Sequence, residues 1–229
     1  MKEQPSLNLS ANIYTVLKDR IIRWQYPPGH RFTEEGLCEE FGVSRSPVRE
    51  VLQMLVENSL VDKELHKCYS VKQLNMEEIH ELYDIRLALE SFVVERLTQQ
   101  SVPPADWQEL YNTWCAILDK FPEPMTDFAH KDEQFHETLA IWKGNKTLVQ
   151  QLHYINERLH FIRMTDITTI ERLQVTRDQH LRILDFIKEK DINCAREALR
   201  INIQSGRENV EHSVKEALAN VYIGIKASA

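Results

Sequence analysis

The chain has 229 residues, enough for one or two domains with a sizeable hydrophobic core. It has no run of 18 apolar residues and its N-terminus is polar, so we expect neither a membrane span nor a secretory signal. The four cysteines are scattered without a Cys-x-x-Cys pair. This spacing favours reduced thiols over a disulfide framework or a zinc knuckle, and so predicts a cytoplasmic protein.

The formal net charge of −7 is unevenly distributed along the chain. Residues 1–72 carry ten basic and ten acidic side chains, whereas residues 73–229 carry eighteen basic and twenty-five acidic ones. A neutral module can still bind DNA if its basic residues share one face. The acidic remainder is not expected to touch a polyanion.

The N-terminal segment predicts two helices in succession. Ser10 can cap a first amphipathic helix, which Pro27-Pro28-Gly29 ends. Thr33 can cap a short second helix that continues to Phe41.

Residues 44–58 predict a third helix with two distinct faces. Ser44 can cap it, and Pro47 falls in the first turn, where a missing N–H costs little. Its buried side is formed by Val48, Leu52 and Leu55. Arg45 and Arg49 line another side, where they could bind guanine edges or phosphates. The alternative is an ordinary capped amphipathic helix with solvated arginines.

Two short extended segments follow this helix and predict a hairpin. They span residues 60–65 and 69–72, around His66-Lys67-Cys68. A hairpin after a helix-turn-helix is a wing, so residues 1–72 are expected to form a winged helix-turn-helix DNA-binding domain. Residues 73–75 are then a linker.

Residues 76–229 show helical periodicity throughout and predict an all-α bundle of about six helices. Breaks are expected at Pro103-Pro104, at Phe121–Pro124 and at Gly144-Asn145. The expected architecture is therefore mostly α, with an N-terminal winged helix-turn-helix and a C-terminal helical domain for effector binding and dimerisation.

Taken together, these motifs resemble the GntR family of bacterial transcription regulators, specifically the FadR-like subfamily with an FCD effector domain. In the N-terminal part the matching residues are Pro28-Gly29, Thr33-Glu34, Leu37, Gly42-Val43-Ser44-Arg45, Pro47-Val48-Arg49-Glu50, Leu52, Leu55 and Leu60-Val61. In the C-terminal part they are Ile79, Leu82, Arg86, Glu90, Asp132, Phe135-His136, Gly144-Asn145, His180 and Ile183.

The resemblance implies a homodimeric regulator, which we expect to be a repressor, bound to a pseudo-palindromic DNA operator. It places DNA contacts at Thr33, Ser44, Arg45, Ser46, Arg49, His66 and Lys67. The wing departs from the family pattern, because Lys67-Cys68 stands where a basic residue and a glycine are usual. Ser59 likewise replaces the usual glycine after the recognition helix.

A candidate metal site lies in the C-terminal part. Asp132 and His136 are four residues apart on one predicted helix, so both can point at one ion. The resemblance adds His180 and places a fourth ligand at Asn202, whose amide oxygen is weaker than an imidazole for zinc or nickel. The expected cofactor is a divalent ion: zinc, nickel or manganese. The alternative is a hydrogen-bonded polar cluster without metal.

The resemblance also implies an effector cavity beside this site. Arg86 and Arg163 are the candidate anchors for a small organic or sugar acid. For Arg86 the alternative role is an ion pair with Glu90 one turn away. A metal-free regulator that responds to an acyl-CoA is the second possibility for the whole chain. A metal-dependent hydrolase is a third possibility. It is disfavoured because the sequence offers no separate general acid or base, and because a hydrolase would not need residues 10–72.

Overall fold

The computed structural model describes residues 4–63, 68–100, 102–119, 126–166 and 170–227. The chain divides into two compact units, one made of residues up to Asn75 together with those from Glu216 onward, the other of Met76–Lys215. Among the described helices, none is both long and apolar enough to cross a membrane.

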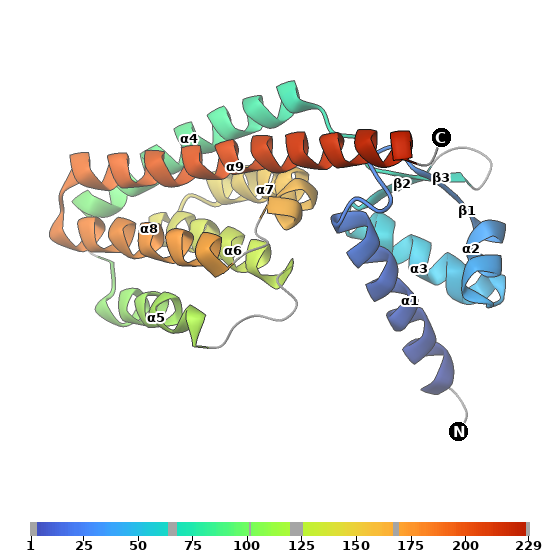
Figure 1. Cartoon of the computed structure of the whole chain (residues 1–229). Coiled ribbons are helices and arrows are strands. Elements are labelled where there is room, and N and C mark those ends of the chain that lie inside the picture. Colours follow the sequence, from blue (N-terminus) through green and yellow to red (C-terminus); the bar gives the residue numbers. More distant parts are fainter. Residues whose placement is uncertain (1–3, 64–67, 101, 120–125, 167–169, 228–229) are drawn as a thin grey trace. The chain divides into compact units, whose positions relative to one another are not determined.

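The N-terminal part of the first unit combines three helices with a small antiparallel sheet (Figure 1). Its elements are α1 (Gln4–Ile22), β1 (Arg31–Thr33), α2 (Glu34–Phe41), α3 (Arg45–Glu57), β2 (Val61–Lys63) and β3 (Cys68–Val71). The strand order is β1-β3-β2, with Phe32 opposite Tyr69 and Val61 opposite Val71. The helix, helix, helix, hairpin order that the sequence predicted is therefore present, with β1 as an additional edge strand.

The core of this unit forms where α1 packs on α3. Leu17 and Ile21 of α1 and Leu52 and Leu55 of α3 are fully buried. The expected cap at Ser10 is wrong, because α1 begins six residues earlier at Gln4. Ser10 lies within that helix instead, buried, and its hydroxyl donates to Glu50 Oε2 at 2.7 Å.

The described secondary structure of the second unit is entirely helical. It contains α4 (Met76–Gln99), α5 (Pro104–Cys115), the 3-10 turn η2 (Ala116–Leu118), α6 (Thr126–Lys143), α7 (Lys146–Asp166), α8 (Ile170–Glu189) and the first two thirds of α9 (Ile192–Ala227). The helix bounds agree closely with the periodicity of the sequence, and the described helices end near the predicted Pro and Gly-Asn breaks.

Four helices of this unit, α4, α6, α7 and α8, form the central bundle, and α5 packs along α8 (Figure 1). Polar contacts join α9 to two of its neighbours: Arg207 NH1 lies 3.0 Å from Asp84 Oδ1 of α4, and Asn202 Nδ2 donates to Gln179 Oε1 of α8 at 3.0 Å. The bundle thereby brings α4, α6, α7, α8 and α9 around one polar centre.

Candidate functional site

The candidate recognition helix α3 follows a tight turn after α2. Thr33 caps α2, where its Oγ1 accepts a hydrogen bond from the Gly36 amide at 3.0 Å. Gly42 closes α2 with φ 64°, a left-handed conformation that glycine adopts without a steric cost. Ser44 then occupies the N-cap of α3 without a side-chain cap bond, so its hydroxyl remains able to meet a phosphate.

Both candidate reading arginines are exposed on α3, and each faces a glutamate of α2. Arg49 Nε lies 2.9 Å from Glu34 Oε2, and Arg45 NH2 lies 3.8 Å from Glu35 Oε1. Glu34 is buried, and its carboxylate therefore restricts the orientation of the Arg49 guanidinium. Ion pairs with an exposed partner are weak, and a DNA phosphate or base edge can replace them.

The remaining candidate DNA contacts divide into two groups. Ser46 is exposed in the first turn of α3, beside Arg45. His66 and Lys67 lie outside the described residues, so the contact expected from the wing stays a prediction.

The second candidate site is a buried cluster of Asp132, His136 and His180. Asp132 and His136 come from consecutive turns of α6, and His180 comes from the middle of α8. Asp132 Oδ1 lies 3.2 Å from His180 Nε2 and 4.0 Å from His136 Nε2, and one donor atom from each residue falls within 4.8 Å of the others. The two histidines are at most 1% exposed.

Glu90 of α4 orients His136. Its Oε2 contacts His136 Nδ1, and its Oε1 accepts from Arg86 Nε at 2.6 Å. Burial alone would raise the pKa of the Glu90 carboxyl, but the charge of Arg86 and the contact with His136 outweigh burial and lower it to about 2. Glu90 is therefore a carboxylate that accepts a hydrogen bond from Nδ1–H of His136, which leaves the lone pair on His136 Nε2 facing Asp132.

His180 is enclosed by aromatic rings. Phe135 stacks on it with centroids 3.8 Å apart, and Trp114 of α5 meets it edge-on at 4.1 Å. Burial lowers the pKa of His136, and burial together with neighbouring positive charge lowers that of His180 well below its usual value. Both rings are therefore neutral at neutral pH, the form that can bind a metal.

Two arginines and an asparagine complete the polar centre. Arg163 of α7 pairs with Asp132 Oδ2, while Arg86 pairs with Glu90. Arg86, Arg163, Asp132 and Asn202 line one small cavity of about 20 Å³, room for about one water molecule. The structure thus brings the sequence-derived metal and effector residues together, and Arg86 also makes the alternative ion pair with Glu90.

Sequence reasoning missed three participants. Glu90 was considered only as a partner for Arg86, and its second bond to His136 depends on the packing of α4 against α6. Tyr83 and Arg172 also line the cavity. Arg172 lies eight residues before His180, two helical turns along the same face of α8, and that spacing could have identified it.

The donor set fits a divalent metal. Among the residues that the structure describes, neither nitrogen of His180 and not the Nε2 of His136 has a hydrogen-bond partner, which is costly for buried polar atoms. An ion that bonds at about 2.1 Å holds its ligand atoms no more than about 4.2 Å apart, so both distances to Asp132 already satisfy this limit. The alternative of a fully hydrogen-bonded polar cluster leaves these three nitrogens unexplained.

Comparison with known proteins agrees with this architecture. Residues 9–64 match the model of the bacterial regulatory proteins of the gntR family, and residues 81–205 match the FCD domain. YdhC, an HTH-type transcriptional regulator of Bacillus subtilis, is 29% identical over 217 residues, covering 90% of this chain and 93% of its own. The gluconate operon transcriptional repressor of the same species is 28% identical over 211 residues, covering 85% and 82%.

A solved structure shares the fold. E. coli McbR/YncC superimposes with a TM-score of 0.59 at 21% identity, covering 90% of this chain and 98% of that one. The relatives are transcriptional regulators, which excludes the reading of this chain as a hydrolase. With a gntR-type helix-turn-helix unit followed by an FCD domain, the chain belongs to the GntR family of bacterial transcriptional regulators.

Proposed function

We propose that this regulator is a homodimeric, cytoplasmic repressor that releases a pseudo-palindromic operator when a small carboxylate binds beside a divalent metal in its helical domain. The observation that carries the effector half of this proposal is the buried centre, where two neutral histidines with unpartnered nitrogens meet Asp132. The DNA half rests on the exposed arginines of α3.

The proposed DNA-binding domain is residues 1–72, followed by a linker of residues 73–75 and an effector and dimerisation domain of residues 76–229. Arg45 and Arg49 would read base edges in the major groove, and the hydroxyls of Thr33, Ser44 and Ser46 would position the helix on phosphates. His66 and Lys67 would add contacts to the backbone. A dimer would present two such helices to adjacent half-sites.

The proposed dimer contact is on α4. Its outer face carries Ile85 and Phe92, which are 50% and 40% exposed, with the half-buried Leu89 between them. These residues recur at i, i+4 and i+7, so they form one apolar stripe. A second copy of the same stripe is the occupant that a two-fold operator requires, because an isologous interface pairs identical surfaces.

The metal would be held by Asp132, His136 and His180, with the amide oxygen of Asn202 as a weaker fourth ligand. The amide nitrogen of Asn202 donates to Gln179 and so points toward α8. This bond supports the amide oxygen as the atom that faces the cavity and would bind the metal. Zinc, nickel and manganese all accept imidazole and carboxylate ligands. The ion would supply positive charge and a rigid tie between α6 and α8.

The effector would be a small organic or sugar acid. The cavity lining is polar, with Arg86, Arg163 and Arg172 around it, which suits a carboxylate rather than the long apolar chain of an acyl-CoA. The gluconate operon repressor among the relatives supports the same class. Because the cavity holds only about 20 Å³, an acid can enter only if side chains move. Arg163 would then exchange part of its contact with Asp132 for the ligand.

This exchange supplies the differential affinity that regulation requires, because the acid binds only the rearranged centre. Selection of bound DNA from a random pool, followed by binding assays with a panel of small acids and with zinc, nickel or manganese, tests the proposal. A selected palindrome whose affinity falls with one acid, and only in metal-loaded protein, supports it. Release by acyl-CoA alone, or by no acid in the presence of metal, would refute the effector assignment.

A further inference from the structure

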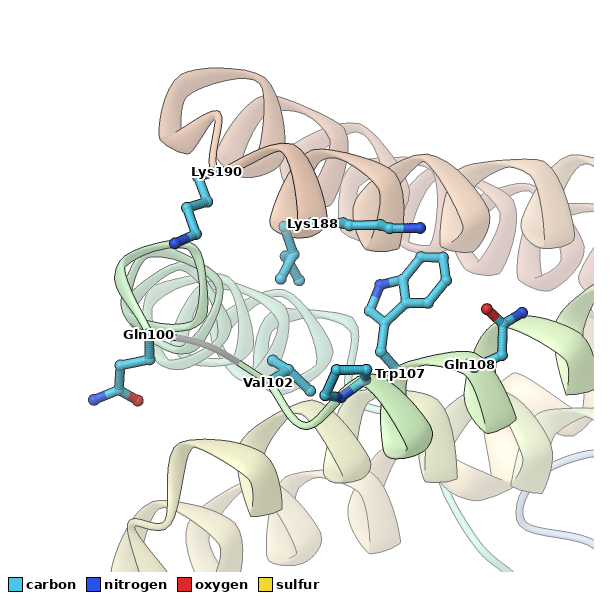
Figure 2. A pocket seen from close by; sticks show the side chains of 8 residues that line it. Gln100, Val102, Trp107, Gln108, Lys188 and Lys190 are labelled. Atoms are coloured by element: carbon cyan, nitrogen blue, oxygen red, sulfur yellow. The ribbon is translucent and has the colours of Figure 1, made fainter.

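We propose that the end of the helical unit formed by α4, α5 and α8 carries a second small-molecule site, for an amphipathic carboxylate with an apolar body. The site is a cavity of about 310 Å³, within the range of pockets that bind small ligands. Its lining residues are Gln100, Val102, Pro104, Trp107, Gln108, Ile187, Lys188 and Lys190 (Figure 2).

The floor of this pocket is apolar and fixed. The indole N–H of Trp107 donates to the Leu184 carbonyl at 3.1 Å, and Tyr111 stacks on the same indole with centroids 4.5 Å apart. Val102 and Ile187 add aliphatic surface beside the ring. Because Tyr111 stacks on the indole and the Lys188 ammonium lies over it, the ring edge and these aliphatic side chains form the apolar floor, which favours a ligand with an apolar body.

The rim of the pocket is cationic. Lys188 places its ammonium 4.1 Å from the centre of the Trp107 ring, and Lys190 stands on the other side of the opening (Figure 2). No carboxylate is among the lining residues, and in the described part of the chain neither lysine forms a salt bridge. The ammonium groups of Lys188 and Lys190 beside an apolar floor complement a carboxylate whose apolar tail lies against that floor.

Lys190 has an unusual backbone conformation for a lysine. Its φ is 61°, in the left-handed position after a helix where glycine is usual. A non-glycine residue is strained there, and at Lys190 the conformation closes α8 through the bond from the Asp191 amide to the Phe186 carbonyl. Lysines near a helix C-terminus also complement the helix dipole, so the test must separate that general role from ligand binding.

This pocket is distinct from the central cavity, with which it shares none of its lining residues. Helices α5 and α8 nevertheless contribute residues to both the pocket and the buried centre around His180. Trp107 and Trp114 lie two turns apart on α5, and the second touches His180 at the centre. Occupation of the pocket would therefore act on the packing of α5 against α8.

The experiment titrates the full-length protein with phenylpropionate, with the neutral phenylpropanol and with propionate. The indole N–H signal of Trp107 in proton–nitrogen NMR is the readout, assigned by Trp107→Phe. Phenylpropionate should shift this signal with saturation, and each analogue that lacks one half of the amphipath should bind at least about fivefold more weakly.

Two variants decide the assignment. Lys190→Gly should weaken phenylpropionate binding at least about threefold while it raises the melting temperature, because glycine relieves the left-handed strain. Lys143→Gln, a matched lysine in the last turn of α6, should leave binding unchanged. Equal weakening by Lys143→Gln, or equal affinity for phenylpropanol, would overturn the proposal.

Discussion

His136 presents its Nδ1 atom to Glu90, a residue 46 positions earlier in the chain, and so turns its other ring nitrogen toward the buried centre. A carboxylate behind a histidine ligand fixes the tautomer and raises the basicity of the ring. The family motif contains both residues, and their contact in the fold leaves the Nε2 of His136 available as a ligand atom.

Glu90→Gln should lower zinc affinity by about 10- to 100-fold, because the Nδ1 proton loses its charged acceptor. It should also lower the free energy of unfolding by about 3 to 5 kcal/mol, since Arg86 is then buried without a counter-charge. The double variant Arg86→Met with Glu90→Gln should regain stability but not zinc affinity. Calorimetry and thermal melting measure the two effects, and normal zinc binding in the double variant would contradict this role of Glu90.

Acid should destabilise the metal-free protein in a defined window. Burial lowers the pKa of His136 and of His180 in the folded state, so the unfolded chain binds more protons than the folded one below about pH 6.5. The free energy of unfolding should therefore fall as pH drops from 7 to 5, by up to about 1.4 kcal/mol per pH unit for each histidine. The pKa of Glu90 is about 2 in the folded state, below its ordinary value of 4.5. Its contribution to the free energy of unfolding is therefore lost only as the pH falls below about 4.5.

Urea denaturation at pH 7, 6 and 5 measures this slope. His180→Gln should flatten it, since one of the two groups is removed. Saturating zinc at pH 7 should raise the free energy of unfolding, because the ion binds the folded state. Stability independent of pH across this window would show that both rings are protonated or solvated in the folded protein.

Asn202→His should tighten metal binding by about tenfold or more, because an imidazole replaces a neutral amide oxygen. Asn202→Ala should weaken binding only slightly if the amide is a marginal ligand. Gln179→Ala, which removes the partner of the Asn202 amide, serves as the neighbouring control and should resemble Asn202→Ala. Equal metal affinity in Asn202→His and the parent protein would place position 202 outside the coordination sphere.

Arg45→Ala and Arg49→Ala should each cost roughly 1–3 kcal/mol of affinity for the selected operator if they read bases. Glu34→Gln should weaken binding less and reduce discrimination between the operator and altered half-sites, because Arg49 loses the buried carboxylate that orients it. Arg23→Ala, an exposed arginine paired with Asp19 at the end of α1, is the control. Unchanged operator affinity in both α3 variants would show that another element reads the DNA.

Ser59→Gly should stabilise the N-terminal unit by about 0.5 to 1 kcal/mol. Ser59 has φ 56°, a left-handed conformation after α3 that costs a serine about 1 kcal/mol or more and that glycine adopts freely. Chemical denaturation followed by circular dichroism measures the gain. Ser46→Gly in the first turn of α3 is the control and should destabilise instead.

The sequence by itself predicted the helices, the hairpin and their order, but not the edge strand β1. Apolar spacing in Leu17 and Ile21, and in Leu52 and Leu55, requires one buried face per helix, so helix positions follow from local periodicity. Capping worked at Thr33 because the bond to Gly36 is local. It failed at Ser10, where the hydroxyl bonds to Glu50, forty residues away.

Only the tertiary structure decided what the polar residues of the bundle do. The motif placed Asp132, His136 and His180 near one another, but helical spacing says nothing about how α4, α7 and α8 meet α6. The packing of the helices places Glu90 against His136, pairs Arg163 with Asp132 and surrounds His180 with aromatic rings. The same packing left a central cavity of only about 20 Å³ and a larger one beside Trp107. Such contacts join residues far apart in the chain, and their geometry depends on how side chains fill the space between helices.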